Sequence, residues 1–291
     1  MKIALITGGE TGEREISINS AKNIASIIKF AETKIFLWPE DVKNFVETKD
    51  EFDIVIPIAH GMGAEDGQMQ KFFESINVLY LFSKPEAHAI GLNKNKTKEI
   101  AKSLNIKTPA EYNFDNIDFP VFAKPKFGGS SIAVKLCNSK EELDDLLKEN
   151  KDLEFIFEEP IKGREFTVGV IDYNDSSIAL PVIEIISETG FFDYKSKYEL
   201  EFLAQEICPA QISEELKNEL QNQALLVHKK IGAKHFSRSD FIVNRTEEIY
   251  FLEINTIPGI TKTSLIPKML NEAKIDFEQV LKQWVDNELN I

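Results

Sequence analysis

Apolar residues recur along the chain at two spacings, and each spacing predicts one kind of element. Short apolar runs at 2–7, 33–38 and 53–59 predict strands, and the almost unbroken third run is typical of a parallel strand buried on both faces. Helical spacing follows at 17–28 and 68–75. Strands that alternate with helices predict an N-terminal α/β region built on a parallel sheet.

Beyond this region the pattern predicts more strands than helices. A first domain boundary is expected near residues 84–85, after a strand at 78–82. Helices are predicted at 93–104, 139–148 and 213–231. Strands are predicted at 119–124, 132–136, 155–157, 166–172 and 178–186.

A hairpin in the last quarter of the chain carries the most informative pattern. Two apolar runs, 241–243 and 249–252, flank a polar tract, which predicts two antiparallel strands. A loop centred near Thr246 would put Asp240 across from Leu252 or Glu253. Strict alternation then predicts two faces of the second strand, Phe251, Glu253 and Asn255 on one and Tyr250, Leu252 and Ile254 on the other.

Oxygen ligands are therefore expected to converge at one end of the hairpin, from Asp240, Glu253 and Asn255. Mg²⁺ prefers such ligands and often takes one or two carboxylates together with substrate phosphates. The alternative is that both acids are solvated on an open sheet face. The turn that follows contains Pro258 and Gly259, and its glycine leaves a backbone N–H free to approach a ligand.

The length of 291 residues is large for one core and favours two or three domains. Hydrophobic residues make up 43% of the sequence and charged residues 28%, which is typical of a globular protein. No apolar run approaches the roughly 18 to 20 residues needed to span a bilayer, so no membrane partner is expected.

The apolar start ends in two glycines and charged residues, which indicates a first strand and not a signal peptide. Cys137 and Cys208 lack metal or disulfide spacing, which fits a reducing cytoplasm.

The formal net charge of −14 argues against nucleic acid as a partner. An anionic nucleotide would need local lysines, backbone amides or a metal ion. Lys124 begins a loop with two glycines that joins two predicted strands, unlike a Walker loop, and such a loop can still fold over a triphosphate. The segment 158–161 stops being strand-like at Pro160, so its main-chain groups could hydrogen-bond an adenine edge.

Glu13 and His60 follow the first and third predicted strands, at the sheet edge where open α/β folds bind ligands. With Glu65 nearby, they could share one pocket. The alternative for His60 is a histidine that closes its loop by hydrogen bonds. The tract 187–202 is aromatic and charged without a clear period, so it is either a mobile lid that excludes water or a loop packed permanently on the surface.

Seven motifs in order resemble those of the D-alanine:D-alanine ligases, members of the ATP-grasp family of carboxylate–amine ligases. They are GGETGEREIS, HGMGAEDGQMQ, NKNKTK, KPKFGGSS, EEPIKGREFTVGV, FFDYKSKY, and RSDF with FLEINTIPGITKTSL. The resemblance covers nearly the whole chain and implies a mixed α/β (α+β) ATP-grasp fold. Three domains are implied: an N-terminal parallel-sheet substrate domain, a central ATP-grasp subdomain, and a C-terminal one with the lid and the metal site, at 1–84, 85–165 and 166–291.

The resemblance also implies roles for residues that match the family's motifs. ATP, as co-substrate, would be bound by Lys94, Lys124, Glu158, Glu159, Ile161, Glu165 and Lys197. Two Mg²⁺ ions, or Mn²⁺ in their place, would be bound by Asp240, Glu253 and Asn255. Two D-alanine molecules would be bound by Glu13, His60, Glu65, Ser264 and Leu265. The catalytic set would be Glu13, Ser130, Tyr198, Arg238, Gly259 and Ser264.

In the implied reaction, ATP converts the carboxylate of the first D-alanine into an acyl phosphate, because a carboxylate is a poor electrophile. The amine of the second D-alanine then attacks, and Arg238 with the backbone N–H of Gly259 would stabilise the oxyanion. Ser130, Tyr198 and Glu13 would form a hydrogen-bonded triad that ties the lid to the other domains. Tyr198 also favours an amine over a hydroxy acid. The implied product serves peptidoglycan synthesis.

A few positions depart from the family's pattern. Ala64 and Ala133 replace frequent glycines, and Asn93 replaces the usual Asp; these changes are expected to adjust loop shape without loss of activity. The pair Lys262-Thr263 borders the second-substrate pocket and leaves its specificity open. Two other functions stay open: an ATP-grasp ligase for a different acid and amine, and a nucleotide-binding regulator without catalysis. The resemblance further implies a cytoplasmic homodimer.

Overall fold

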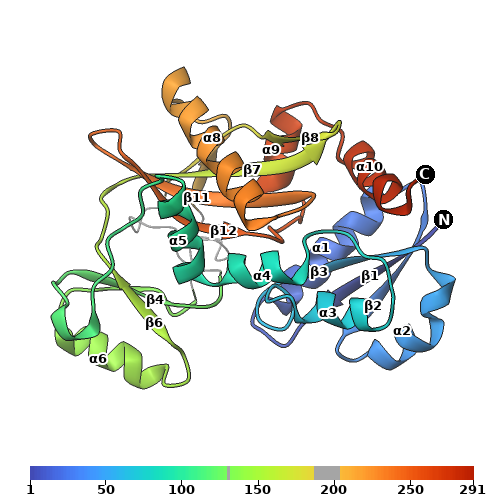
Figure 1. Ribbon diagram of the computed structural model, residues 1–291, viewed down its shortest axis with the longest axis horizontal. Coiled ribbons are helices and arrows are strands. Elements are labelled where there is room, and N and C mark those ends of the chain that lie inside the picture. The colour runs from blue at the N-terminus through green and yellow to red at the C-terminus, as the bar shows by residue number, and fades with distance from the viewer. Residues whose placement is uncertain (130–131, 187–203) are drawn as a thin grey trace.

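The N-terminal sheet consists of three parallel strands in the order β2-β1-β3 (Figure 1). The computed structural model describes residues 1–129, 132–186 and 204–291. The strands are β1 (Lys2–Gly8), β2 (Glu32–Trp38) and β3 (Ile54–Ala59). The helical segments of this region are α1 (Arg14–Ile27), α2 (Val42–Thr48), the short η1 (Lys49–Glu51) and α3 (Gln68–Ser75). The predicted α/β region is confirmed, with α3 at the predicted bounds.

The predicted strand at 78–82 is wrong. Tyr80 makes only an isolated bridge to Val55, and Phe82 has a φ of 78°, which takes the chain out of the extended conformation. The chain instead enters α4 (Pro85–Leu92), whose first residue is a proline. Asn93 then caps α5 (Lys94–Ser103) by accepting two backbone N–H groups.

The second sheet is small and antiparallel, in the order β5-β4-β6. Its strands are β4 (Val121–Pro125), β5 (Lys135–Cys137) and β6 (Phe155–Glu158), with η2 (Phe114–Asn116) before them and α6 (Lys140–Glu149) against β5. The predicted strand at 132–136 begins too early, because Ala133 has a φ of 55°.

The third and largest sheet has the order β10-β9-β7-β11-β12, with β8 beside β7. Its strands are β7 (Gly163–Tyr173), β8 (Ser176–Ala179), β9 (Ile183–Ile186), β10 (Gln205–Ile207), β11 (Phe236–Asn244) and β12 (Ile249–Asn255). The single strand predicted at 178–186 is wrong. It is divided into β8 and β9 around Pro181, which has no N–H to donate to a ladder.

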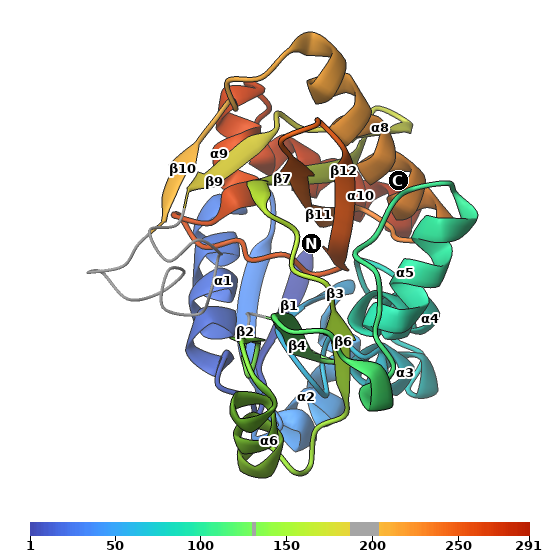
Figure 2. The ribbon, with the colours of Figure 1, turned by 90° about the vertical axis from the view of Figure 1, so that its left-hand side faces the viewer.

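Three helices follow or accompany this sheet. They are α8 (Glu214–Ile231), α9 (Leu265–Glu272) and α10 (Phe277–Leu289). α8 packs on β7, β11 and β12, and α4 and α5 pack beside β12 (Figure 2). Within the described residues, no helix combines the length and the apolar composition that a membrane span requires.

The hairpin of β11 and β12 contains a β-bulge. Asp240 pairs with Glu253, whereas Phe241 pairs with Phe251, so Leu252 is an extra residue in β12. Phe251 and Ile254 therefore both lie in one hydrophobic core. The faces predicted by strict alternation are wrong, because the bulge reverses the alternation at Leu252. Of the two predicted partners of Asp240, Leu252 and Glu253, the structure shows Glu253.

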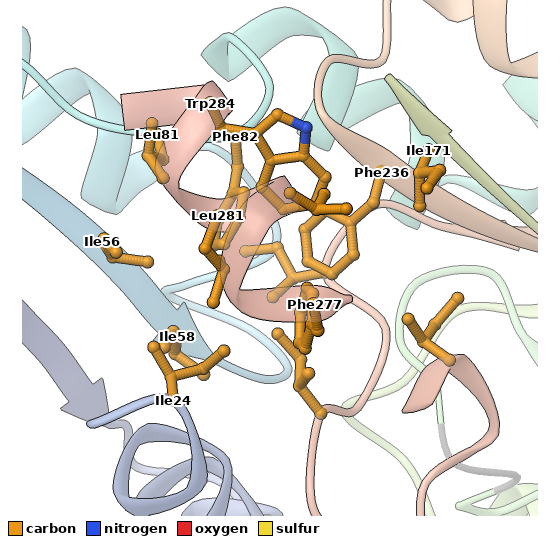
Figure 3. Packing of buried hydrophobic residues seen from close by; sticks show 14 of the residues in the cluster. Ile24, Ile56, Ile58, Leu81, Phe82, Ile171, Phe236, Phe277, Leu281 and Trp284 are labelled. Carbon is orange, nitrogen blue, oxygen red and sulfur yellow. The ribbon is translucent and has the colours of Figure 1, made fainter. Parts of the chain in front are cut away.

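The largest hydrophobic core joins the N-terminal sheet to the C-terminal helices. Ile56 and Ile58 of β3 and Ile24 of α1 belong to the same cluster as Phe236 and Trp284 (Figure 3). A separate core lies between α8 and the other face of the large sheet, and the small sheet has its own core with α6. The division into three domains at residues 84 and 165 stays a prediction.

Candidate active site

Two adjoining cavities lie among the three sheets, and both are lined by Glu13 and Gly129. The first has a volume of about 370 Å³ and the second of about 340 Å³, each within the usual range of small-molecule sites. The first is lined by side chains from the loop after β1, from α5, from the small sheet and from the β11–β12 hairpin. The second is lined by the loops after β1 and β3, by β11 and by residues 257–265.

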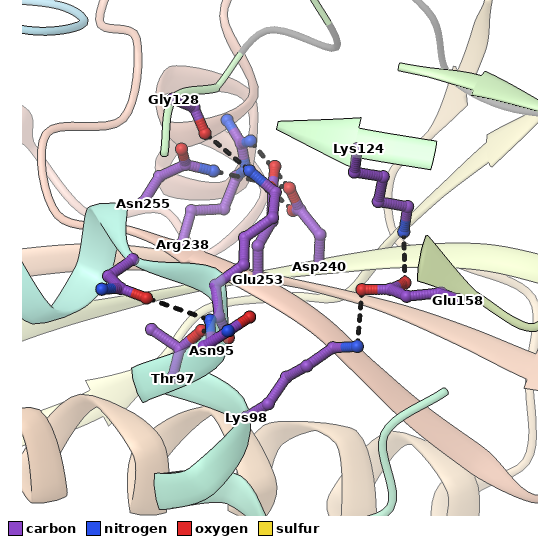
Figure 4. A network of polar contacts seen from close by, with 12 residues as sticks. Asn95, Thr97, Lys98, Lys124, Gly128, Glu158, Arg238, Asp240, Glu253 and Asn255 are labelled. Atoms are coloured by element: carbon purple, nitrogen blue, oxygen red, sulfur yellow. Dashed lines mark hydrogen bonds and ion pairs between the residues drawn. The ribbon is translucent and has the colours of Figure 1, made fainter. Parts of the chain in front are cut away.

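The open end of the hairpin carries a cluster of charged and polar side chains, which Figure 4 shows in contact with one another. Asp240 and Glu253 line the first cavity, and Arg238 and Asn255 line the second. Asp240 accepts two hydrogen bonds from the Arg238 guanidinium, at 3.0 and 2.9 Å. Thr167 donates its hydroxyl to the same carboxylate at 2.6 Å, and the Asn255 amide lies 3.5 Å from it. Because the bulge turns Glu253 toward the cavity, its carboxylate lies 3.3 Å from the Lys94 ammonium.

Lys94 links this cluster to the glycine loop after β4. Its ammonium group donates a hydrogen bond to the carbonyl of Gly128 at 2.6 Å. Gly128 has a φ of 109°, a conformation that favours glycine, and a Cβ added there would meet nothing within 4 Å. The backbone of the loop is thus held over the first cavity with space beside it.

Lys124 and Glu158 form another wall of the first cavity, and a second lysine, Lys98, lies behind Glu158. Lys124 of β4 donates to Glu158 of β6 at 2.8 Å, and Lys98 of α5 lies 2.5 Å from the other carboxylate oxygen. Burial alone would raise the pKa of the Glu158 carboxyl, but the two lysines hold it below its ordinary value. Glu158 is therefore an anion in spite of being only 2% exposed.

The second cavity contains two buried carboxyl groups. Burial, followed by the nearby Glu13 carboxylate, raises the pKa of Glu65 to about 8. The backbone N–H of Gly61 donates to Glu65 at 2.9 Å. Burial lowers the pKa of His60, with Glu13 acting in the opposite direction. At neutral pH Glu65 and His60 are therefore both uncharged beside Glu13.

The turn after β12 has a fixed shape at the edge of the second cavity. Ser264 accepts the backbone N–H of Thr261 at 3.0 Å, and the two hydroxyls lie 2.7 Å apart. A Cβ added at Gly259 would lie 3.1 Å from the Ser264 hydroxyl, which is tighter than an ordinary contact. Asn23 of α1 donates to the carbonyl of Ile260 at 2.7 Å, so α1 holds the turn in place.

The structure gathers the described members of the predicted site into these two cavities. The first is lined by Glu13, Lys94, Lys124, Glu158, Glu159, Ile161, Glu165, Asp240 and Glu253. The second is lined by Glu13, His60, Glu65, Arg238, Asn255, Gly259, Ser264 and Leu265. Three predicted residues, Ser130, Lys197 and Tyr198, lie outside the described residues, as does the predicted lid at 187–202.

Sequence reasoning missed several residues of the site. Phe122, Ile242 and Leu252 line the first cavity, and Thr167 fixes Asp240. Lys98 lies four residues after Lys94 on α5, a spacing that puts both side chains on one helix face, so helical periodicity could have found it. Thr167 offered no such signal, because a threonine in a strand is usually explained by packing.

The hairpin oxygens fit a hard divalent cation. Asp240, Glu253 and Asn255 supply two carboxylates and an amide at the junction of the cavities. Each carboxylate has a cationic side chain beside it, Arg238 for Asp240 and Lys94 for Glu253, so a metal ion would have to compete with these ion pairs. In the described part of the chain no group of three or more His, Cys, Asp or Glu side chains could hold a metal, so a metal site at the hairpin would have to include a ligand of another type, such as the Asn255 amide oxygen.

Comparisons with known proteins agree with this geometry. The family described as "D-ala D-ala ligase C-terminus" matches residues 87–286. The D-alanine–D-alanine ligase of Fusobacterium nucleatum is 36% identical over 291 residues, covering 98% of this chain and 99% of the relative.

Solved structures extend the likeness to the fold. The D-alanine–D-alanine ligase of Bacillus anthracis complexed with ATP superimposes with a TM-score of 0.82 at 26% identity, covering 100% of this chain and 98% of that one. The VanG D-Ala:D-Ser ligase of Enterococcus faecalis gives a TM-score of 0.81 at 26% identity, with 99% of each chain covered. The mixed α/β ATP-grasp fold implied by the sequence motifs is therefore confirmed. The chain belongs to the family of D-alanine–D-alanine ligases.

Proposed function

We propose that the protein joins two molecules of D-alanine into D-alanyl-D-alanine while it converts ATP into ADP and phosphate. The observation that carries the proposal is the pair of adjoining cavities that share Glu13 and Gly129. Lysines and hairpin oxygens line the first, which suits a triphosphate. The second is of amino acid size, so an amino acid bound there would lie beside the terminal phosphate.

In the first step, a carboxylate oxygen of the first D-alanine attacks the terminal phosphorus of ATP, and the bond to ADP breaks. Lys94 and Lys124 would bind the phosphates, and Glu13 the ammonium group of the amino acid, with uncharged His60 near its carboxylate. Glu158, Glu159, Ile161 and Glu165 would surround the base and ribose. The product of this step is an acyl phosphate.

In the second step, the amine of the second D-alanine attacks the acyl carbon, loses a proton, and phosphate leaves. The Arg238 guanidinium and the backbone N–H of Gly259 would stabilise the oxyanion, since both line the second cavity. Ser264 and Leu265, at the start of α9, would bind the second D-alanine. From the resemblance we add Lys197 on the terminal phosphate and the triad of Ser130, Tyr198 and Glu13.

Asp240, Glu253 and Asn255 would hold two Mg²⁺ ions, or Mn²⁺. When bound, these ions neutralise charge on the transferred phosphoryl group. Arg238 and Thr167 orient the Asp240 carboxylate for this role through the hydrogen bonds they donate to it.

Phosphate release from ATP tests the proposal. We expect release with D-alanine and Mg²⁺, weak release with D-lactate and none with L-alanine, and a D-alanyl-D-alanine product in the mass spectrum. Equal release with L-alanine, or none with any acid, would contradict it. Nucleotide binding without release would instead support a regulator.

A second candidate function is ligation of D-alanine to D-serine. The likeness to a D-Ala:D-Ser ligase favours it, and so does the hydroxyl of Thr263 at the wall of the second cavity. A larger yield of the mixed dipeptide than of D-alanyl-D-alanine at equal amino acid concentrations would select this candidate.

We also propose that the enzyme is a homodimer and works in the cytoplasm, where ATP is supplied and cell-wall precursors are made. Both proposals rest on the family resemblance. Light scattering on the purified protein tests the first, because a monomer at micromolar concentration would contradict it. Fractionation of cells tests the second.

A further inference from the structure

The Lys98 side chain is almost completely buried, with 1% of its surface exposed. Its ammonium group lies 2.5 Å from Glu158 Oε1 and 3.5 Å from both the Glu111 carboxylate and the Pro109 carbonyl. It does not line the first cavity, whereas Glu158 and Lys124 do. A buried lysine is costly unless it is paired, so this position requires an explanation.

Glu158 is held from two sides (Figure 4). Lys98 contacts one of its oxygens, and Lys124 donates to the other at 2.8 Å. Lys102, on the next turn of α5 and 57% exposed, lies 4.0 Å from Glu111. Lys98 and Lys124 therefore both contact the single carboxylate of Glu158, and these three side chains carry one positive charge in excess. Lys102 lies outside this group, beside Glu111.

The arrangement around Glu158 has an electrostatic consequence for the cavity. If Lys98 were absent, Glu158 and Lys124 would form a neutral pair, and the negative charge of Glu158 would cancel the positive charge of Lys124. With Lys98 present, the Lys98 ammonium group neutralises Glu158 from the side that faces away from the cavity. The positive charge of Lys124 then acts on whatever enters the cavity, because attraction is strong where water is excluded.

We propose that Lys98 is a positioning residue for nucleotide binding, which acts through Glu158 by fixing its carboxylate and balancing its charge so that Lys124 can attract the phosphates. The inference rests on the proposed function only in taking the first cavity as the nucleotide site. Lys98 touches neither substrate nor reacting atoms and is not a catalytic residue.

Calorimetric titration of the full chain with ADP and Mg²⁺ tests the proposal. Lys98→Met keeps the length of the side chain and removes its charge, and we expect the Kd for ADP to rise roughly 10- to 100-fold. Lys98→Arg restores the charge and should recover most of the affinity. Lys102→Met, on the same helix and near the same Glu111, is the matched control and should change the Kd less than about 2-fold.

Steady-state kinetics separate positioning from general damage. In Lys98→Met the KM for ATP should rise by the same factor as the Kd for ADP, while kcat at saturating ATP and the KM for D-alanine change less than about 3-fold. An unchanged Kd for ADP in a folded Lys98→Met variant would overturn the proposal, and so would equal losses in kcat and in D-alanine affinity.

A double-mutant cycle shows whether Lys98 acts through Glu158. Glu158→Gln removes the carboxylate, and the double variant Lys98→Met/Glu158→Gln removes both buried charges, so it is expected to fold even where Lys98→Met alone does not. We expect Lys98→Met to weaken ADP binding less than about 2-fold in the Glu158→Gln background. A loss there as large as in the parent background would overturn the proposal.

The two proposals fail in different ways. A parent protein that binds ADP but forms no dipeptide contradicts the proposed function and leaves the Lys98 test intact. A parent that forms dipeptide, with Lys98→Met binding ADP as tightly as the parent, contradicts the role of Lys98 alone.

Discussion

Burial decides the chemistry of Glu65. Its side chain is 8% exposed and lies near a second carboxyl group, that of Glu13. Burial is the largest of the effects that raise its pKa to about 8, ahead of the charge of Glu13, and the N–H donated by Gly61 opposes them. The folded protein therefore favours the uncharged acid, while the unfolded chain ionises near the ordinary value of 4.5.

Stability should therefore depend on pH through Glu65. Because the pKa is raised in the folded state, the stability it contributes below pH 4.5 is lost as the pH rises toward 8. Glu65→Gln removes this titration, so its Tm relative to the parent should increase between pH 5 and pH 8.5, by roughly 2 °C or more. Differential scanning calorimetry measures the effect. Glu10→Gln, at an exposed position, is the control, and a constant Tm difference for Glu65→Gln would contradict the argument.

Arg238 lies at the boundary of the two cavities. Arg238→Ala should lower kcat about 10²- to 10³-fold, because it removes a donor to the oxyanion. The Kd for ADP should change far less, because Thr167 still holds the Asp240 carboxylate in place, and calorimetry can check this. Arg245→Ala, at the exposed tip of the same hairpin, is the matched control. Unchanged turnover in Arg238→Ala would remove this residue from the chemistry.

Acids in strands and glycines in loops were predictable from sequence, because residue type and local spacing mark them. Thr167 was not, since its importance comes from a partner on another strand, Asp240. Helical spacing could have placed Lys98 on the same face as Lys94, but not its burial against Glu158, because a buried and an exposed lysine look the same in the sequence.

The β-bulge at Leu252 determines which side chains the hairpin turns toward the site. Deletion of Leu252 would remove the extra residue and leave strict alternation, in which Phe251 and Ile254 still face the core and Glu253 still faces the cavity. We therefore expect the deletion variant to keep the pairing of Asp240 with Glu253 and to bind ADP within about 10-fold of the parent in calorimetric titration. Leu252→Ala keeps the bulge and should also retain binding within about 10-fold. Loss of ADP binding in the deletion variant alone would show that the shape of the bulge, and not only the register of the strands, positions Glu253.

Element boundaries followed from sequence where the period was long and clear, as in α3 and α8. They failed where one residue interrupted the backbone pattern, at Phe82, Pro181 and Leu252. A left-handed φ, a missing N–H and an extra residue in a strand each change the backbone at a single residue. The spacing of apolar residues is judged over many residues, so it could not predict these local changes.

One hydrophobic core joins segments from both ends of the chain. Trp284 of α10 is 1% exposed, packs edge-on against Phe82 and Phe277, and donates its ring N–H to the carbonyl of Asp172 at 2.6 Å. His235 completes the junction by accepting the backbone N–H of Phe82 at 2.8 Å. The N-terminal sheet and the large sheet are thus packed into a single unit on this side.

Trp284→Ala should lower the free energy of unfolding by about 3 to 5 kcal/mol, because it leaves a large cavity in this core. Trp284→Phe keeps an aromatic ring and loses the hydrogen bond to Asp172. It should lower the free energy of unfolding by about 1 to 2 kcal/mol. Urea unfolding followed by circular dichroism measures both. Equal losses for the two variants would show that the hydrogen bond outweighs the packing.

The arrangement of the three sheets was not predictable from the residues alone. Apolar periodicity identifies which face of an element is buried but not which other element covers it. Ile24 and Trp284 read as ordinary core residues of separate segments, and only the fold shows that they share a cluster. The family resemblance predicted the fold, because related sequences share the same packing between segments that are distant in the chain.

The shared core has a consequence for how a cell makes this protein. During synthesis β1 and β3 leave the ribosome long before α10 does. Until α10 is made, Ile56 and Ile58 of the N-terminal sheet are therefore exposed to solvent. Contacts between such distant segments form slowly, since a long loop must close first. Nascent chains should therefore bind chaperones until the final helix arrives.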